Sequence, residues 1–356
     1  MSIENGIASG VLADSCAIER KSRLMSVKRR KSSKRKRNTG NHRKPTQYRL
    51  ESGYGLSRLY TRRVSRVICH WRSGNNSVPA SRSNATIDAI HNKAAIGLSV
   101  AGAPGFQFLD LGTSSFEPAF ASPAGRISED PLFDPTRNLL LSATEINDFE
   151  IVDVATSTSP AFFENRGIPS EGELDSSAEE CTTGIALAPA EFSGPSHVFI
   201  ADLTQATFTA GSPGTWTAPS QVQSLSESFL AAGPSGSAVA QGTHTGVVTG
   251  EFGGKTLTAI ALPATSGSGT PAIGDWVTCA IGSGFSNGFD PHTVTAYQSP
   301  NTGDAIAALA NGGATILAVV DLTQMLNPTI VPRTGAGHGC ASGTLPATVV
   351  SFITVP

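Results

Sequence analysis

The residues best placed to do chemistry form a cationic run near the N-terminus. Positions 28–37 hold eight Lys or Arg among ten residues with no acidic residue between them, and two more cations follow at 43 and 44. Flexible cations at this density bind phosphate by releasing condensed counterions, which requires no fixed geometry. The residues that we predict to bind nucleic acid are Lys28, Arg29, Arg30, Lys31, Lys34, Arg35, Lys36, Arg37, Arg43, Lys44 and Arg49.

This basic region has two further features. Its doublet of clusters matches the pattern of a nuclear import signal. Aromatic residues also interleave with arginines, at Tyr48, Tyr54, Tyr60 and Trp71. Such rings could stack on unpaired bases. Alternatively, Leu59-Tyr60 and the apolar residues of positions 64–68 anchor this region on the folded body, and the sequence leaves both interpretations open.

Gly284-Phe285-Ser286-Asn287-Gly288 fits the nucleophile-elbow pattern of serine hydrolases, with Asp290 and His292 close behind. That elbow needs a helix directly after the serine, and an acid and a histidine delivered from distant loops. Here Pro291 and a strand-like run follow instead. We therefore predict no catalytic residues and no enzymatic activity, and a β-rich hydrolase using Ser286 is the weakest alternative.

Three other patterns could bind ligands. Gly250 to Thr256 nearly forms a phosphate-binding loop but has one residue too few, and a strand-like run follows it, so a hairpin explains it better. His338 and Cys340 could be a metal pair, but no second pair lies nearby. The acidic groups around Asp134, Glu150 and positions 171–180 lack the spacing of a calcium loop. We therefore predict no metal and no cofactor.

The charge is strongly divided along the chain. Residues 1–93 hold 21 of the 26 Lys and Arg and 5 of the 28 Asp and Glu, whereas residues 94–356 hold 5 bases and 23 acids. The near-neutral pI of 6.4 conceals this division. The basic segment has too few aliphatic residues to offset the entropy of ordering it, which predicts a disordered arm over residues 1–84.

The five cysteines are scattered and form no Cys-x-x-Cys pair, which predicts reduced thiols. No apolar run is long enough to span a bilayer, so we expect no membrane partner and a protein that stays soluble inside the cell.

The elements that must position any site are short strands. Runs rich in Val, Ile, Thr and aromatic residues are bounded by Gly, Pro, Asn or Ser. They lie at 105–111, 139–144, 149–154, 197–202, 207–209, 246–249, 256–262, 276–281, 293–297, 315–322 and 349–355. Helices are predicted at 221–232 and 304–311. One short sequence occurs twice, each time directly after an apolar strand-like run: Asp202-Leu203-Thr204-Gln205 and Asp321-Leu322-Thr323-Gln324. This echo indicates either duplicated halves or one way of ending a strand that is used twice.

Without strand–helix alternation, about ten strands predict an all-β fold, an antiparallel jelly-roll β-sandwich preceded by the disordered basic arm. The jelly roll would occupy residues 85–356, with long loops and room for a small projecting subdomain.

A Lys/Arg-rich arm before a body rich in Gly, Thr, Ser and Pro resembles the coat proteins of small icosahedral viruses with single-stranded genomes, such as nodavirus-like, tombusvirus-like and small single-stranded DNA virus capsids. The resemblance implies a structural capsid protein that self-assembles into a closed homo-oligomeric shell. The arm would package viral single-stranded nucleic acid, RNA or DNA. The chain would be found in the virion and, during assembly, in the host nucleus or cytoplasm. The alternative is a non-viral nuclear nucleic-acid-binding protein with a β-sandwich module.

Overall fold

The computed structural model describes residues 81–99, 105–122, 128–144, 148–154, 161–165, 174–190, 197–224, 233–250, 256–267, 269–282, 285, 294–310, 315–335 and 337–354. Within these ranges the protein is all-β, as predicted, with only two short helical turns, η1 (Leu203–Gln205) and α4 (Leu322–Leu326). None of the helices in these ranges is long and apolar enough to cross a membrane. The predicted arm, residues 1–84, falls almost entirely outside the described residues.

The strands form five sheets, named A to E in chain order. Sheet A comprises β1 (Ser81–Asp88), β2 (Lys93–Ser99), β3 (Gly105–Asp110) and β4 (Ser115–Ala121). Sheet B comprises β5 (Ser128–Asp134), β6 (Leu139–Thr144), β7 (Asp148–Asp153) and β8 (Ala161–Glu164), extended by β13 (Gly214–Thr217) and β12 (Thr207–Thr209). Sheet C comprises β9 (Ala178–Glu180), β10 (Ile185–Ala190), β11 (His197–Asp202) and β14 (Ser220–Ser224).

The last two sheets occupy the C-terminal half. Sheet D comprises β15 (Pro234–Ala240), β16 (Thr245–Gly250), β17 (Thr256–Ala261) and β18 (Trp276–Ala280), extended by β22 (Gly339–Thr344). Sheet E comprises β19 (Val294–Gln298), β20 (Ala305–Ala310), β21 (Ile316–Asp321) and β23 (Val350–Thr354). Neighbouring strands are antiparallel except at β13–β8 and β18–β22, which are parallel.

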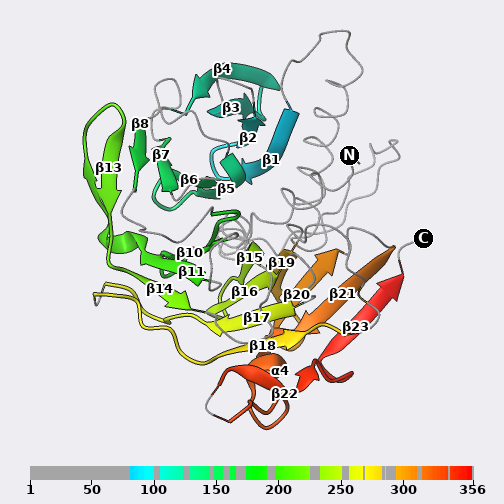
Figure 1. Ribbon diagram of the computed structural model, residues 1–356. Helices are drawn as coiled ribbons and strands as arrows, with labels where there is room; N and C mark the ends of the chain where they lie inside the picture. Colours follow the sequence, from blue (N-terminus) through cyan, green and yellow to red (C-terminus); the bar gives the residue numbers. More distant parts are fainter. Residues whose placement is uncertain are drawn as a thin grey trace, which may run out of the picture.

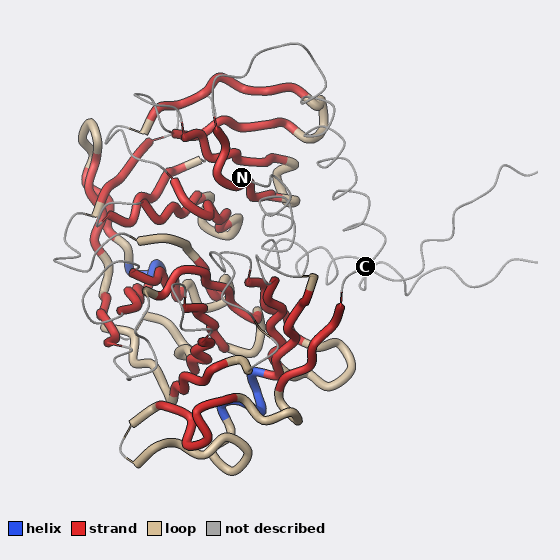
Figure 2. The backbone as a smooth tube through the Cα atoms, turned by 45° about the vertical axis from the view of Figure 1, so that its right-hand side comes forward, coloured by secondary structure: helices blue, strands red, loops and turns tan. Residues whose placement is uncertain are grey.

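The five sheets stack face to face around an arc, like the blades of a propeller. The first strands of successive sheets contact one another in the order β1, β5, β9, β15 and β19. Figure 1 shows the arc running from sheet A at the top, through B and C on the left, to D at the bottom and E at the lower right. In Figures 1 and 2 the described strands of the two end sheets, A and E, do not pack against each other.

Apolar clusters fill each interface between neighbouring sheets. Phe106 and Phe108 of sheet A pack on Phe133 of sheet B. Phe149 of sheet B packs on Phe199 of sheet C. Similar clusters join C to D and D to E. The inner sheets are therefore buried on both faces, so strands such as β6, β10 and β16 contain no exposed residue and read as continuous apolar or small-residue runs.

A repeated hairpin joins the first two strands of every sheet. In the first four sheets the residue directly before the second strand has a left-handed backbone, with φ of 55° at Asn92, 58° at Asn138, 71° at Gly184 and 52° at His244; in the longer turn of sheet E, Gly303 has φ of 83° one position earlier. Asn and Gly tolerate this conformation best. In the first two sheets an aspartate fixes the turn: Asp88 accepts the amides of Ile90 and His91, and Asp134 accepts that of Thr136.

This hairpin is the sequence signal that the jelly-roll prediction missed. Asp88, Asp134 and Glu180 are spaced 46 residues apart, and each is followed four positions later by Asn92, Asn138 or Gly184. A fixed period of this length is typical of repeated-blade architectures.

The sequence echo also belongs to this repeat. Asp202 and Asp321 end β11 and β21, the third strands of sheets C and E, and each caps a short helical turn. Each carboxylate also accepts from the side-chain amide three residues later, Gln205 at 2.8 Å and Gln324 at 2.9 Å. The echo is therefore one strand exit used in two of the repeated sheets.

The jelly-roll prediction is wrong, because a jelly roll has two sheets and this chain forms five. The helix predicted at 304–311 is wrong, because β20 occupies 305–310; the helix predicted at 221–232 is wrong at its start, which β14 occupies, and positions 225–232 lie outside the described residues. Ala305–Ala310 alternates buried and half-buried positions, which is the period of a strand. Asp304, which resembles a helix cap, belongs instead to the turn between β19 and β20; Gly312 lies outside the described residues.

We predict that Gly184→Ala destabilises the protein more than Gly303→Ala, measured by chemical denaturation. Both glycines have a left-handed backbone, which should cost about 1–2 kcal/mol for alanine. A Cβ on Gly184 would also lie 2.3 Å from Arg137 Nη2 and 2.8 Å from Thr204 Cγ2, whereas a Cβ on Gly303 would meet nothing within 4 Å. The expected loss at Gly184 is about 3 kcal/mol in total. Equal losses at the two sites would contradict this packing.

Candidate functional site

The predicted nucleic-acid-binding residues, from Lys28 to Arg49, all lie outside the described residues, so the structure gives them no geometry. The described body does show what its own cations do. Lys93 pairs with Glu117 at 3.2 Å, and Arg333 pairs with Asp275 at 2.6 Å. Arg137 pairs with two carboxylates, as detailed below. Every Lys and Arg whose side chain is described in residues 85–354 is therefore already neutralised by an acid.

The most unusual polar group on the body is a set of charged side chains that we call the inter-sheet ionic cluster: Asp134, Arg137, Glu179, Glu180 and His244. The repeated hairpin turns position it, because these residues lie in or beside the turns of sheets B, C and D. Arg137 Nη1 donates to Asp134 Oδ2 at 2.7 Å and to Glu179 Oε1 at 3.0 Å. Both carboxylate side chains have zero exposure.

The electrostatics of this cluster are dominated by burial. Desolvation, reinforced by the negative charge of Asp134, raises the pKa of Glu179 well above its ordinary value of 4.5, although Arg137 acts in the opposite direction. Burial lowers the pKa of Arg137, but Glu179 and Asp134 outweigh it and leave that pKa above its ordinary value. Glu179 Oε2 has no hydrogen-bond partner among the described residues.

The cluster continues from sheet C into sheet D. Glu180 Oε2 lies 3.1 Å from His244 Nδ1. The backbone N–H of Cys181 donates to Gln241 Oε1 at 2.9 Å, and Gln241 Nε2 donates to the Glu179 carbonyl. Three consecutive sheets are thus joined at their hairpin ends. Because the carboxylates are sealed from solvent, the arrangement fastens the sheets together and leaves no room for a substrate.

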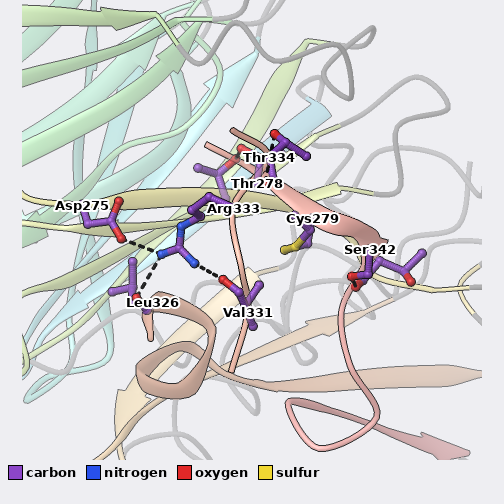
Figure 3. The surroundings of a disulfide bond; sticks show 12 residues. Asp275, Thr278, Cys279, Leu326, Val331, Arg333, Thr334 and Ser342 are labelled. Carbon is purple, nitrogen blue, oxygen red and sulfur yellow. Dashed lines mark hydrogen bonds and ion pairs between the residues drawn. A yellow bond between two sulfur atoms is a disulfide. The ribbon is translucent and has the colours of Figure 1, made fainter. Parts of the chain in front are cut away.

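A second polar group surrounds a disulfide between Cys279 of β18 and Cys340 of β22 (Figure 3). Arg333 pairs with Asp275 and donates to the carbonyls of Leu326 and Val331. The His338 ring stacks on Trp276 with ring centroids 4.0 Å apart. These contacts fix the loop before β22 onto sheet D.

The disulfide corrects the prediction of reduced thiols. Cys279 and Cys340 are not reduced thiols, and Cys181 is also disulfide-bonded. Cys340 is therefore not available as a metal ligand beside His338. Among the described residues no three His, Cys, Asp or Glu side chains gather as a metal site would require. The sequence could not reveal this bond, because 61 residues separate its two cysteines.

The remaining sequence candidates give no site within the part of the chain that the structure describes. Gly250 ends β16 and Thr256 begins β17, and these strands pair as a hairpin, so the phosphate-loop resemblance is incidental, as expected. Ser286, Asp290 and His292 lie outside the described residues, and β19 begins at Val294.

Two shallow hollows open on the described surface. One, of about 480 Å³, is lined by Glu164, Asn165 and the 213–217 segment. The other, of about 370 Å³, lies between the hairpin turns of sheets D and E and has Asp304 as its only titratable lining residue. With a single acid each, neither offers paired acid–base groups.

No protein-family model and no curated protein match this chain. Several solved structures are similar in fold at low identity. A chain of the mitotic checkpoint complex aligns at 12% identity and a TM-score of 0.45, covering 70% of this chain and 62% of that one. A chain of a nidogen/laminin complex aligns at 9% and 0.44, covering 68% and 77%. The periplasmic gluconolactonase PpgL of Pseudomonas aeruginosa aligns at 12% and 0.47, covering 77% and 74%.

The chain thus spans less than two thirds of the first of these proteins. With TM-scores below 0.5, the likenesses carry no argument about activity, and the architecture rests on the sheet pairings themselves. The capsid interpretation is wrong: it required a single jelly roll, the chain forms five stacked sheets, and none of these three structures is a viral coat protein. The expectations of an icosahedral shell, a virion location and genome packaging followed from that interpretation and lose their basis with it.

We predict that the stability of the protein falls as the pH rises above 4.5, the ordinary pKa of the Glu179 carboxyl, and that Glu179→Gln flattens this fall. The folded state holds the Glu179 proton more tightly than the unfolded state does, because its pKa is raised. Stability is therefore lost as the pH rises from the ordinary pKa towards the folded one. Thermal unfolding at several pH values measures the effect. Glu117→Gln, which removes a carboxylate from the partly buried pair with Lys93 on sheet A, is the comparison variant, and an equal flattening in both variants would contradict the assignment.

The disulfide predicts a second result. In denaturant without reductant, peptides containing Cys279 and Cys340 should resist alkylation, and both should react after reduction. Replacing both cysteines by alanine should lower the free energy of unfolding by about 2–4 kcal/mol. Alkylation of either cysteine before reduction would show that the bond is absent.

Proposed function

We propose that this protein binds single-stranded nucleic acid through its N-terminal cationic stretch, Lys28–Lys44 with Arg49, and that the propeller-like body acts as an acidic scaffold. The observation that carries the proposal is the division of charge: 21 of the 26 bases precede residue 94, and 23 of the 28 acids follow residue 93. A polyanion is attracted to the first part of the chain and repelled by the second.

The ion pairs of the body support this proposal. Lys93, Arg137 and Arg333 each already face a carboxylate. Phosphate would have to displace those carboxylates, at Arg137 from a position where both acids are sealed from solvent. The cationic stretch carries no such internal partners in sequence, since positions 28–50 contain no acidic residue. It is therefore the part of the chain best able to exchange counterions for phosphates.

Two tyrosines favour single strands over duplexes. Tyr48 and Tyr54 lie on either side of Arg49. Aromatic rings stack on unpaired bases, which contributes about 1–3 kcal/mol per base without requiring a particular sequence. Bases in a duplex do not offer this face.

Binding of a labelled oligonucleotide to the full chain tests the proposal. Neutralising all eight cations of positions 28–37 with glutamine should abolish most of the salt dependence. In the wild type, affinity should fall about 10³-fold or more between 50 and 200 mM salt. The matched control is a variant with the same 28–37 residues in shuffled order, which should bind like the wild type, because counterion release does not depend on sequence.

The outcomes separate the components of the proposal. Tyr48→Ala with Tyr54→Ala should weaken binding to a single strand about tenfold or more while leaving duplex binding unchanged. A heparin fragment of equal charge that bound as tightly as the single strand would show a general polyanion site instead. Unaltered binding by the glutamine variant would refute the role of the stretch.

A further inference from the structure

The outer face of sheet E differs from every inner sheet surface. Paired residues share a face, so the strand registers define it in three rows: Tyr297, Ile306 and Asp321; then Thr295, Ala308, Val319 and Ser351; then Ala310, Leu317 and Ile353. None of these side chains is buried, and Tyr297 and Ile353 are 45% and 50% exposed. On the opposite face of the same sheet, Ala307, Leu309 and Val320 are buried against sheet D.

This face is apolar enough to need a cover. Of the five large hydrophobic side chains exposed on the described surface, Tyr297 and Ile353 lie on this face, whereas Phe352 pairs with the buried Ala318 and so lies on the opposite one. Apolar patches of this kind mark contact sites. Sheet E is also the last sheet of the arc, so no further described sheet lies on its outer side (Figure 1).

The other end of the arc is already covered. Ile87, Ala94 and Leu109 lie on the face of sheet A that points away from sheet B, and their exposures are 6%, 1% and 0%. Within the described residues their cluster draws members from sheet A alone. The chain enters β1 at this same end, after 80 preceding residues.

One segment of those 80 residues has the pattern of a surface-packing helix. Its apolar residues recur at helical spacing, namely Leu56, Leu59, Tyr60, Val64, Val67, Ile68 and Trp71. On a helix, Arg58, Arg62 and Arg66 would lie together on the opposite side. The charge of this segment is complementary to that of the body. Residues 56–72 contain five arginines and no acid, whereas the body is acidic.

We propose that residues 56–71 pack their apolar side on the outer face of sheet E and so close the arc between sheets E and A. The nine residues between Trp71 and Ser81 can span about 35 Å. The arginines then face solvent at the junction and continue the cationic stretch. This assigns Tyr60 and Trp71 to packing and leaves Tyr48 and Tyr54 for bases.

Photo-cross-linking of the full chain tests the contact directly. Tyr297→p-benzoylphenylalanine places the reactive group on the outer face of sheet E, and Phe208→p-benzoylphenylalanine is the control, since Phe208 on β12 is similarly exposed at 41%. The expected result is cross-links from position 297, and not from 208, to peptides of residues 56–71 within a single chain. Cross-links from 297 to a second copy, or only to other segments, would overturn the proposal.

A second measurement guards against a misleading cross-link. Val64→Asp with Val67→Asp should lower Tm by about 5 °C and raise the fluorescence of a hydrophobic dye several-fold. Thr61→Asp with Ser65→Asp adds the same charge on the polar side of the segment and should leave both readings unchanged. Indistinguishable behaviour of the two variants would overturn the proposal, and neither measurement depends on nucleic-acid binding.

Discussion

The structure depends on burying both faces of its inner sheets. A sheet without a polar face cannot stand alone in water, so each sheet requires a neighbour on either side. The chain meets this requirement with aromatic interfaces at the start of the arc, where Phe106 and Phe108 meet Phe133, and with smaller side chains later, where Ala305 and Ala307 meet sheet D. Small residues are needed where sheets approach closely: a Cβ on Gly246 would lie 2.9 Å from Leu187 Cδ2 in the next sheet.

Much of the local structure could be predicted because strands depend on local sequence. Leu139–Thr144 and Thr256–Ala261 were predicted almost residue for residue from apolar content and flanking turns. The architecture could not be obtained in this way, since a sandwich and a stack of five sheets use strands of the same length and composition. Only the spacing of Asp88, Asp134 and Glu180 distinguishes them, and it becomes visible when the turns are compared with one another.

The polar residues were harder to interpret than the strands. Glu179 and Glu180 read in the sequence as part of a solvated acidic loop, yet both are fully buried. Their partners, Arg137 and His244, lie 42 and 64 residues away, so no local pattern could pair them. The same holds for Cys279 and Cys340. The ionic cluster and the disulfide both act between distant parts of the chain, and both serve the stacking of sheets rather than chemistry at an open site.

The segment between η1 and β14 determines when sheet B can be completed during synthesis. Between η1 and β14 the chain leaves sheet C, adds β13 in parallel to β8 of sheet B, and then returns; Trp216 fixes this excursion by donating to the Phe149 carbonyl at 2.7 Å. Sheet B is thus completed by residues made 50 positions after its own fourth strand ends. During synthesis on the ribosome, the outer edge of β8 stays unpaired until the segment that contains β13 has left the ribosome. Sheet D waits likewise for β22, so nascent chains expose two strand edges to chaperones or to each other before the fold is sealed.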